Sequence, residues 1–244
     1  MQLVRSAKPY WVVAPPYTHA SSGVRVLYKL MDGLLERGHE IKLTSESIVI
    51  YPDTTRGNPL RAKNVVRYLL APAGKYGGSV SFPRTDMVWG YSKSIASNLL
   101  FIPVSDPDIF YPPAMCLRVG ECFYSHKYEL HGNKPEPGHK KRLTGTLDNI
   151  AEILRSSTRC YIYELSSVIH EAALCGCPVT LMRTPYFNEY NEAVSVLVGD
   201  IEWSDGQKLC SLTAQQSLRV YERLEEEYKN QLDEFIYQTQ ERFS

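Results

Sequence analysis

Two glutamates and two serines lie close together in the second half of the chain, with types and spacing suited to binding a phosphorylated sugar. Glu164 follows residues 159–163, a short apolar and aromatic run typical of a strand, and Ser166, Ser167 and Glu171 come next. The serines precede a helical stretch, whose first N–H groups and positive dipole end favour a phosphate. Glu171, about one turn into that helix, has a carboxylate that can accept hydrogen bonds from the vicinal hydroxyls of a sugar.

The same residues also have an interpretation without any ligand. Serines commonly cap helices, and a glutamate in the first helical turn is favoured by the helix dipole alone. In an open α/β sheet, however, ligands bind outside the carboxyl ends of the strands. That rule would place Glu164, Ser166 and Ser167 at a ligand-binding edge, so both interpretations stay open at this point.

Metal or redox chemistry is a weaker alternative. The cysteines are at positions 116, 122, 160, 175, 177 and 210. No pair has C-x-x-C spacing, so we expect reduced thiols, with Cys175 and Cys177 as the alternative metal or redox pair. Asp106 and Asp108 could form a metal-binding D-x-D pair, but they lie in a proline-rich stretch rather than at the end of a strand. We therefore expect no metal and no bound cofactor.

The residues that would position this chemistry alternate between strand and helix patterns. At the start, residues 10–13 and 40–43 read as strands, and apolar residues recur at helical spacing over residues 24–35, with Ser21 or Ser22 as the N-cap. Such a βαβ opening predicts a mostly parallel sheet.

The remaining chain continues this alternation on both sides of a proline-rich stretch. Residues 103–113 contain four prolines, which fit an extended linker. An amphipathic helix is predicted at the C-terminal end over residues 218–236. The other predicted strands are 65–70, 87–91, 99–102, 116–124, 159–163 and 178–182, and the other predicted helices are 147–154 and 168–175.

Length, charge and composition narrow the classes of protein. The chain has 244 residues, 27 Lys plus Arg and 27 Asp plus Glu. Zero net charge argues against a general nucleic-acid binder, and 43% hydrophobic residues argue against disorder. No apolar stretch is long enough to span a bilayer, and the apolar run at 11–13 is too short for a signal peptide. We expect a cytoplasmic protein.

Residues 159–179 resemble the nucleotide-sugar site of glycosyltransferases with the GT-B fold, close to the large retaining family that carries an E-x7-E motif. The stretch from Glu171 to Val179, EAALCGCPV, is similar to the second half of that motif. The resemblance implies that Glu171 holds the ribose of the nucleotide and that Glu164 lies near the donor sugar. The chain departs from the pattern by having six residues between the glutamates, and by Leu165-Ser166-Ser167 in place of glycines.

Two neighbouring stretches resemble the same family. Residues 104–112 are similar to its G-V-D-x-x-x-F-x-P entry into the donor domain, and residues 117–127 to the first strand and loop of that domain. Lys127 matches the lysine that neutralises the diphosphate leaving group. Glu121 stands where the family commonly has an arginine, and Arg118 is a candidate for the missing charge. His126, Lys140, Lys141 and Arg142 are further candidates, although a solvated loop is the alternative for residues 140–142.

The loop at residues 15–25 resembles the family's glycine-rich loop after the first strand. This resemblance implies that Ser22 and Gly23 approach the donor phosphates and that His19 is a candidate base toward an acceptor hydroxyl. Tyr17 and Arg67 are candidates for the acceptor side. A surface role for His19, and an ion pair with a carboxylate in the sheet for Arg67, are the alternatives.

Taken together, these features predict an α/β protein with two small Rossmann-like domains facing across a cleft. Residues 1–103 would be the acceptor-side domain, 104–215 the nucleotide-sugar domain, and 216–244 a helix packed on or across them. The expected activity is metal-independent, retaining hexosyl transfer from a nucleotide diphosphate sugar to a glycan or lipid-linked acceptor in polysaccharide biosynthesis, with peripheral membrane contact. The alternative is a non-catalytic homologue that binds a sugar nucleotide or a protein partner. A sugar-nucleotide epimerase would need a G-x-x-G-x-x-G turn, which residues 14–23 lack.

Overall fold

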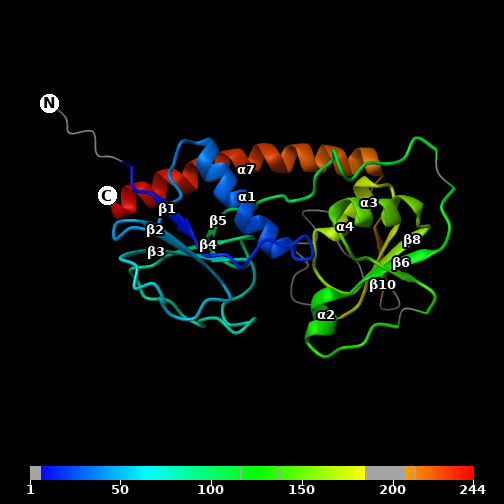
Figure 1. Ribbon diagram of the computed structural model, residues 1–244, viewed down its shortest axis with the longest axis horizontal. Coiled ribbons are helices and arrows are strands. Elements are labelled where there is room, and N and C mark those ends of the chain that lie inside the picture. Colours follow the sequence, from blue (N-terminus) through cyan, green and yellow to red (C-terminus); the bar gives the residue numbers. More distant parts are fainter. Residues whose placement is uncertain (1–6, 116, 137, 185–206, 211–212) are drawn as a thin grey trace. The chain divides into compact units, whose positions relative to one another are not determined.

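The computed structural model describes residues 7–115, 117–136, 138–184, 207–210 and 213–244. The chain divides into two compact units (Figure 1). Unit 1 comprises Met1–Pro103 and Leu224–Ser244, and unit 2 comprises Val104–Arg223. Each contains a five-stranded, largely parallel sheet, so the chain is an α/β protein, compatible with Rossmann-like units. Among the described residues, no helix combines the length and apolar composition that a bilayer span requires.

The sheet of unit 1 has its five strands in sequential order, all parallel. Helix α1 (Ser22–Glu36) connects the first two strands, and the last two thirds of α7 (Ala214–Phe243) pack with it on one face of the sheet (Figure 1). The strands are β1 (Tyr10–Val12), β2 (Ile48–Pro52), β3 (Asn64–Leu69), β4 (Met87–Gly90) and β5 (Asn98–Leu99).

The strands predicted at residues 10–13, 65–70 and 87–91 and the helix predicted over 24–35 are confirmed, whereas the strand predicted at 99–102 ends at Leu99 in β5. Ser21 is the N-cap of α1, and its side chain accepts a hydrogen bond from the Val24 N–H. The strand predicted at residues 40–43 is wrong, because there Ile41 makes only an isolated bridge to Tyr10. The strand beside β1 is β2, whose five residues are all buried. A strand buried on both faces is a continuous apolar run rather than an alternating one, and residues 48–51 fit that description.

The apolar stripe of α7 closes one face of this sheet. Phe235 packs edge-on against Trp89 of β4, with ring centroids 5.0 Å apart, and also contacts Tyr10 of β1. Gly33 of α1 faces Tyr228 and Leu232, which allows the two helices to approach closely. The predicted amphipathic helix is therefore confirmed, and its buried stripe forms part of the core of unit 1.

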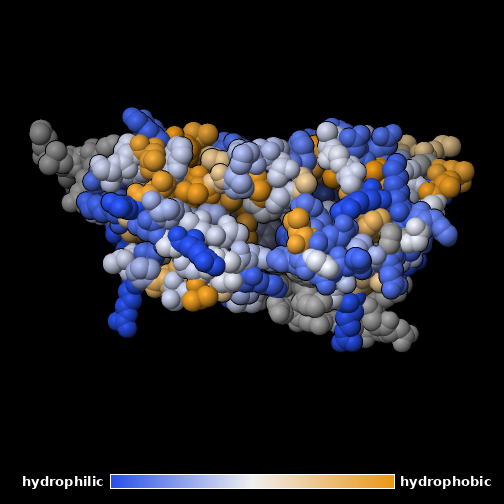
Figure 2. Space-filling view, turned by 60° about the horizontal axis from the view of Figure 1, so that its bottom comes forward, coloured by the Kyte–Doolittle hydropathy of each residue, from blue (hydrophilic) through white to orange (hydrophobic). Residues whose placement is uncertain are grey.

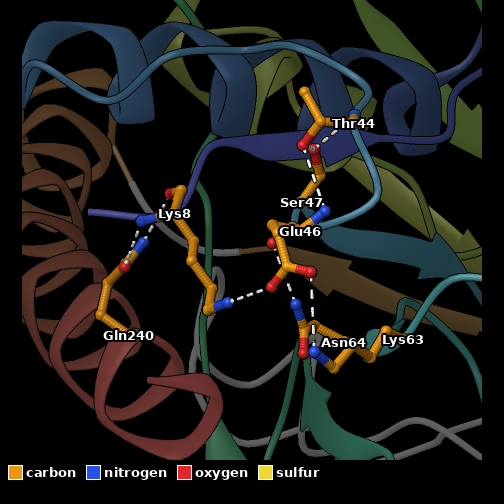
Figure 3. Close-up of polar contacts among 7 residues, drawn as sticks. All are labelled: Lys8, Thr44, Glu46, Ser47, Lys63, Asn64 and Gln240. Atoms are coloured by element: carbon orange, nitrogen blue, oxygen red, sulfur yellow. Dashed lines mark hydrogen bonds and ion pairs between the residues drawn. The ribbon is translucent and has the colours of Figure 1, made fainter. Parts of the chain in front are cut away.

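A polar network ties the amino ends of the first three strands to the end of α7 (Figure 3). Gln240 exchanges two hydrogen bonds of 2.9 Å with the backbone of Lys8, just before β1. The Lys8 ammonium pairs with Glu46 at 2.8 Å, and the Glu46 carbonyl accepts from Asn64, the first residue of β3. Lys63 pairs with the same carboxylate at 3.6 Å. Structural contacts thus occupy this edge of the sheet.

The sheet of unit 2 has the order β10-β9-β8-β6-β7, and only β10 runs antiparallel to its neighbour. Its strands are β6 (Glu121–Tyr124), β7 (Lys141–Arg142), β8 (Arg159–Ile162), β9 (Val179–Met182) and β10 (Gln207–Cys210), and its helices, besides the start of α7, are α2 (His126–Leu130), α3 (Leu147–Ser156) and α4 (Val168–Leu174).

Local sequence signals account for the helices α3 and α4. Thr146 caps α3 in a capping box with Asn149. Gly176 follows α4 at φ +66°, a conformation that a glycine adopts without strain. The predicted strand 116–124 is shorter than expected, because β6 begins only at Glu121.

On the visible surface of the molecule, hydrophobic residues occur in several patches among hydrophilic ones (Figure 2).

Candidate functional site at the carboxyl edge of unit 2

The strand order of unit 2 creates one position where ligands typically bind in open α/β sheets. From β6 the chain first adds β7 on one side and then returns to add β8, β9 and β10 on the other side. Between β6 and β8 the direction of winding therefore reverses, and the carboxyl ends of these two strands border a topological switch point. In unit 1 the sequential strand order provides no such reversal.

Glu164 lies at this switch point, two residues after β8. Its side chain is fully buried, and its Oε2 accepts a hydrogen bond of 2.6 Å from the backbone N–H of Tyr128 in α2. Its Oε1 is buried and has no hydrogen-bond partner among the described residues. Burial raises the pKa of this carboxyl, while the bond from Tyr128 and the charge of Lys127 act in the opposite direction. A carboxylate is thus held away from water between the ends of β6 and β8.

Residues at or just after the ends of three strands, β6, β8 and β9, contact one another near Glu164 in the chain. The rings of Tyr128 and Tyr163 lie 5.4 Å apart, and the Tyr163 N–H donates to the carbonyl of Tyr124 at the end of β6. Thr184, two residues after β9, donates its hydroxyl proton to the Tyr163 carbonyl at 2.8 Å. The sequence analysis did not select Tyr128, Tyr163 or Thr184. The one signal in the sequence that could have identified them is their position within a few residues of the end of a strand.

Lys127 is on α2, where its charge acts on the Glu164 carboxyl, so the structure brings these two predicted residues together. Helix α2 is not among the helices that the sequence predicts. Its short sequence has no apolar period. Its N-terminal amide at Tyr128 is satisfied by Glu164, a residue distant in sequence. Tertiary contacts of this kind are not visible as a local pattern.

The serines and Glu171 occupy the start of α4, on the same edge of the sheet. Ser166 is buried, and its Oγ accepts a hydrogen bond of 3.4 Å from the N–H of Val168, the first residue of α4. Ser167 is the N-cap position but makes no side-chain capping bond. Glu171 lies in the first turn of the helix and is fully buried. A second buried carboxylate thus lies in the first turn of α4.

Arg118 lies away from this edge, and its predicted contact with a donor phosphate is not supported. It precedes β6 and therefore lies at the amino end of the sheet. Its guanidinium donates to the carbonyls of Leu154, Ser157 and Cys175, at 3.0, 3.0 and 2.8 Å, at the carboxyl ends of α3 and α4. A cation is favoured at these helix ends by the dipole. Arg118 is therefore a structural residue in this conformation.

The basic residues near β7 are partly neutralised by acids. Arg142 pairs with Glu129 at 2.8 Å, and Lys140 lies 3.9 Å from Glu121. Glu121 also accepts a 2.8 Å hydrogen bond from the Tyr161 hydroxyl. Glu121, found where the resembled family commonly has arginine, thus has structural partners on this side of the sheet.

In unit 1, the loop after β1 brings three rings together. Tyr17 and His19 are exposed, and their rings meet edge-on at 5.1 Å. Tyr17 also packs edge-on against Tyr28 of α1 at the same separation. Ser22 and Gly23 form the first turn of α1, where a side chain at Gly23 would come within 3.3 Å of Leu70. This cluster lies at the carboxyl edge of the unit 1 sheet.

Arg67, predicted for the acceptor side, lies within the sheet instead. Its side chain is 2% exposed, and its Nε donates to Asp86 at 2.7 Å. Its Nη1 donates to the Gly57 carbonyl, and the guanidinium lies over the rings of Tyr51 and Phe82. The alternative interpretation, an ion pair with a carboxylate in the sheet, is confirmed, and the acceptor role is not supported.

The weaker metal alternatives find no support in the described part of the chain. No group of three or more His, Cys, Asp or Glu residues placed to hold a metal ion occurs there. Cys175 and Cys177 are buried free thiols. The Asp106 side chain accepts the Asp108 N–H at 2.9 Å within a turn, rather than at the end of a strand. Cys116 lies outside the described residues.

The site that emerges is a buried carboxylate, a lysine and two tyrosines at the switch point of unit 2, with Glu171 on the adjoining helix. Such a site can bind hydroxyl groups and, through Lys127, an anionic group. No family model, no curated protein and no solved structure matches this chain.

Proposed function

We propose that the chain is a glycosyltransferase that moves a sugar from a nucleotide diphosphate sugar to a hydroxyl of a glycan or glycolipid acceptor. The observation that carries the proposal is the position of Glu164, buried with an unsatisfied Oε1 at the topological switch point of unit 2. A buried carboxylate oxygen without a hydrogen bond is costly, so such oxygens need an explanation in function or in an absent ligand. A sugar hydroxyl supplies the missing donor.

The other residues have complementary roles in this proposal. Glu171, on the adjoining helix, accepts hydrogen bonds from the ribose hydroxyls. Lys127 supplies the positive charge that stabilises the departing nucleoside diphosphate. Ser166 and Ser167 lie between the two glutamates in sequence and supply polar groups to the diphosphate. Arg118 is left out, because its guanidinium already donates to three carbonyls at the other edge of the sheet.

The acceptor side is proposed for unit 1, in the GT-B arrangement that the sequence resemblance implies. The candidates there are His19 and Tyr17, which lie in contact on an exposed loop. An exposed histidine is able to exchange protons with an acceptor hydroxyl, which is the requirement for a base. Retention of the anomeric configuration, a cytoplasmic location and independence from metal remain parts of this proposal.

One observation favours a second function, binding of a sugar nucleotide without turnover. Glu164 already uses Oε2 to accept the Tyr128 N–H at 2.6 Å, and its side chain has no exposure to solvent. A carboxylate committed to this structural bond is less available for chemistry. The six-residue spacing between Glu164 and Glu171 points in the same direction.

A panel of nucleotide sugars, assayed for release of nucleoside diphosphate, distinguishes the two functions. We expect one donor to be consumed when a glycan or glycolipid acceptor is present, and Glu171→Ala to abolish that consumption. Glu152→Ala is the matched control, because Glu152 is an exposed glutamate in the same unit. Donor binding without release, in the presence of acceptors, would favour the binding function. Absence of both would contradict the proposal.

A further inference from the structure

The positive charge of this neutral chain is concentrated in residues 54–85. They contain six lysines and arginines and no aspartate or glutamate, a net charge of +6. The rest of the chain has 21 basic and 27 acidic residues, a net charge of −6. No other stretch of the same length has so large a positive excess. Local charge, rather than the total of zero, governs contact with a charged partner.

The fold gathers this segment on one face of the sheet of unit 1. Helices α1 and α7 cover the opposite face, whereas the connections at residues 53–63 and 70–86 contain no helix and lie on the other side (Figure 1). The guanidinium of Arg67 in β3 contacts both connections, because it donates to the Gly57 carbonyl and lies over the Phe82 ring. We call the exposed cations of these connections the basic face, which comprises Arg56, Arg61, Lys63 and Arg84.

The two acids that flank the segment do not neutralise the basic face. Asp86 pairs with the buried Arg67, and Asp53 is itself buried. Lys63 lies 3.6 Å from the carboxylate of Glu46. Within the part of the chain that the structure describes, none of the three arginines of the basic face forms an ion pair. Their charges are therefore available to a partner.

The two connections are joined to each other and form a fixed surface. The Nε of Arg56 donates to the Gly77 carbonyl, and the Gly57 N–H donates to the Ser79 hydroxyl at 2.9 Å. Gly78 lies so close to the backbone of the other connection that a Cβ there would come within 1.7 Å of a carbonyl oxygen. A surface that is already ordered binds a ligand at a lower entropic cost than a flexible loop does.

Arg61 has a backbone conformation that a glycine adopts at lower cost. Its φ is +52°, and it is the one non-glycine residue with a positive φ in the described chain. Asn58 fixes this turn, because its side chain accepts the Ala62 N–H at 2.9 Å and donates to the Ala62 carbonyl at 2.8 Å. Strained backbone of this kind clusters at functional sites. An exposed arginine in a position suited to glycine indicates a function for its side chain.

Guanidinium groups on a fixed surface fit a polymer that carries carboxylate or phosphate groups. Arginine binds both groups with paired hydrogen bonds, and three of the four cations of the basic face are arginines. A nucleic acid fits less well, because single strands are bound by stacking bases on exposed rings. The aromatic residues of the segment, Tyr68, Tyr76 and Phe82, are buried or partly buried. An acidic glycan offers the same anionic groups without bases to stack.

We propose that the basic face of unit 1 binds a glycan that carries carboxylate or phosphate groups. That this glycan is the acceptor rests on the proposed function, whereas the binding itself does not. The affinity depends on salt, because exposed charges are screened. Nucleotide binding and glycan binding are separate measurements, so a failure of this inference is distinguishable from a failure of the proposed function.

The test is fluorescence-polarisation titration of the whole chain with labelled oligogalacturonate, phosphorylated oligomannose and neutral maltodextrin of similar length. We expect binding of at least one acidic glycan, weakened by raising the salt, and no binding of the neutral one. Arg61→Gln with Arg84→Gln should weaken binding by about tenfold or more. Lys229→Gln with Arg242→Gln is the matched control, because it removes equal charge at exposed positions of α7 and should leave binding within about twofold.

Arg61→Gly separates binding from stability. Glycine adopts a positive φ without strain, so this variant should be as stable in urea as the unaltered chain. It should nevertheless bind the acidic glycan about fivefold or more weakly, because the guanidinium is absent. The same variant replaces the double substitution if that one fails to fold.

The proposal is overturned if neither acidic glycan binds, or if Arg61→Gly binds it as tightly as the unaltered chain. An equal loss in the control pair also overturns it, because that loss would indicate a response to net charge alone. Equally tight binding of a single-stranded oligonucleotide of the same length would contradict it by indicating a site for any polyanion. Thermal unfolding of each variant checks that it is folded.

Discussion

The Oε2 of Glu164 and the backbone N–H of Tyr128 are 2.6 Å apart, and this hydrogen bond joins the carboxyl ends of β8 and β6. The two strands are neighbours in the sheet but are separated in sequence by α2, β7 and α3. One side chain thus fixes the start of α2 and places a second, unsatisfied oxygen at the switch point. A ligand that engages Glu164 also affects α2, because both depend on the same carboxylate.

Replacing Glu164 by glutamine should separate the stabilising role from the functional role. Burial raises the pKa of Glu164, so the unfolded chain loses this proton first as the pH rises. Above the pKa that Glu164 has in the folded chain, its ionised carboxyl destabilises the folded state. Below the pKa of the unfolded chain, about 4.5, the carboxyl is protonated in both states and this destabilisation is absent. Glutamine keeps a carbonyl acceptor for Tyr128 and carries no charge. We expect Glu164→Gln to raise the free energy of unfolding by about 1–3 kcal/mol at pH 7.5. Near pH 4 the free energy of unfolding should not change. Urea denaturation at the two pH values measures both.

The control for this prediction is Glu152→Gln, an exposed position on α3, which should change stability little at either pH. Glu164→Gln should also lose donor turnover, because a substitution that stabilises a functional site commonly costs activity. Equal stabilisation at both pH values would show that the burial of charge is not the cause.

The buried pair of Arg67 and Asp86 should be essential for the stability of unit 1. Removing one partner leaves a buried charge uncompensated, which typically costs about 3–5 kcal/mol. We therefore expect Arg67→Met to lower the free energy of unfolding by about that amount. Arg84→Met, at an exposed position nearby in sequence, should have little effect. A loss of acceptor binding by Arg67→Met in folded protein, with donor binding unchanged, would instead support the acceptor-side role that the geometry does not favour.

Arg118 should behave as a structural residue rather than as a donor ligand. Its three bonds to carbonyls at the ends of α3 and α4 are charge-assisted, and the side chain packs beside Gly176. Arg118→Met should lower the denaturation midpoint by several degrees while leaving donor affinity unchanged at a temperature where the variant is folded. Lys127→Met should show the reverse pattern. The hypothesis fails if Arg118→Met weakens nucleotide binding without loss of stability.

Gly33 should be required for the contact between α1 and α7. A methyl group there would overlap the Tyr228 hydroxyl and lie 2.7 Å from Leu232 Cδ2. Gly33→Ala should thus destabilise the chain by about 1–3 kcal/mol, despite the better helix propensity of alanine. Removing the obstructing hydroxyl in Gly33→Ala/Tyr228→Phe should restore part of the loss, as measured by urea unfolding of the double-mutant cycle. Additive losses in the cycle would contradict this contact.

The elements that the sequence predicts well are those with strong local signals. The period of α1, the capping residue Thr146 and the glycine after α4 all act within a few residues. Strand β2 was missed because an alternating stretch just before it looked more like a strand. Alternation marks a strand with one exposed face, whereas β2 is buried throughout.

The candidate site was only partly predictable, because its contacts join residues distant in sequence. Glu164 and Lys127 were selected separately, and the structure brings them to one edge of the sheet. The charge and the sequence positions of Arg67 and Arg118 suggest anion binding. Their partners, Asp86 for Arg67 and three backbone carbonyls for Arg118, depend on the tertiary fold. Tyr128 was missed because α2 has no pattern of its own.

The most direct measurement of the central claim is calorimetric titration of the intact chain with nucleoside diphosphates and their sugar conjugates. The account predicts that at least one binds with a defined stoichiometry, that Glu171→Ala weakens it by about tenfold or more, and that Glu152→Ala does not. Absence of binding by every nucleotide at millimolar concentration, or equal affinity in Glu171→Ala, would contradict it.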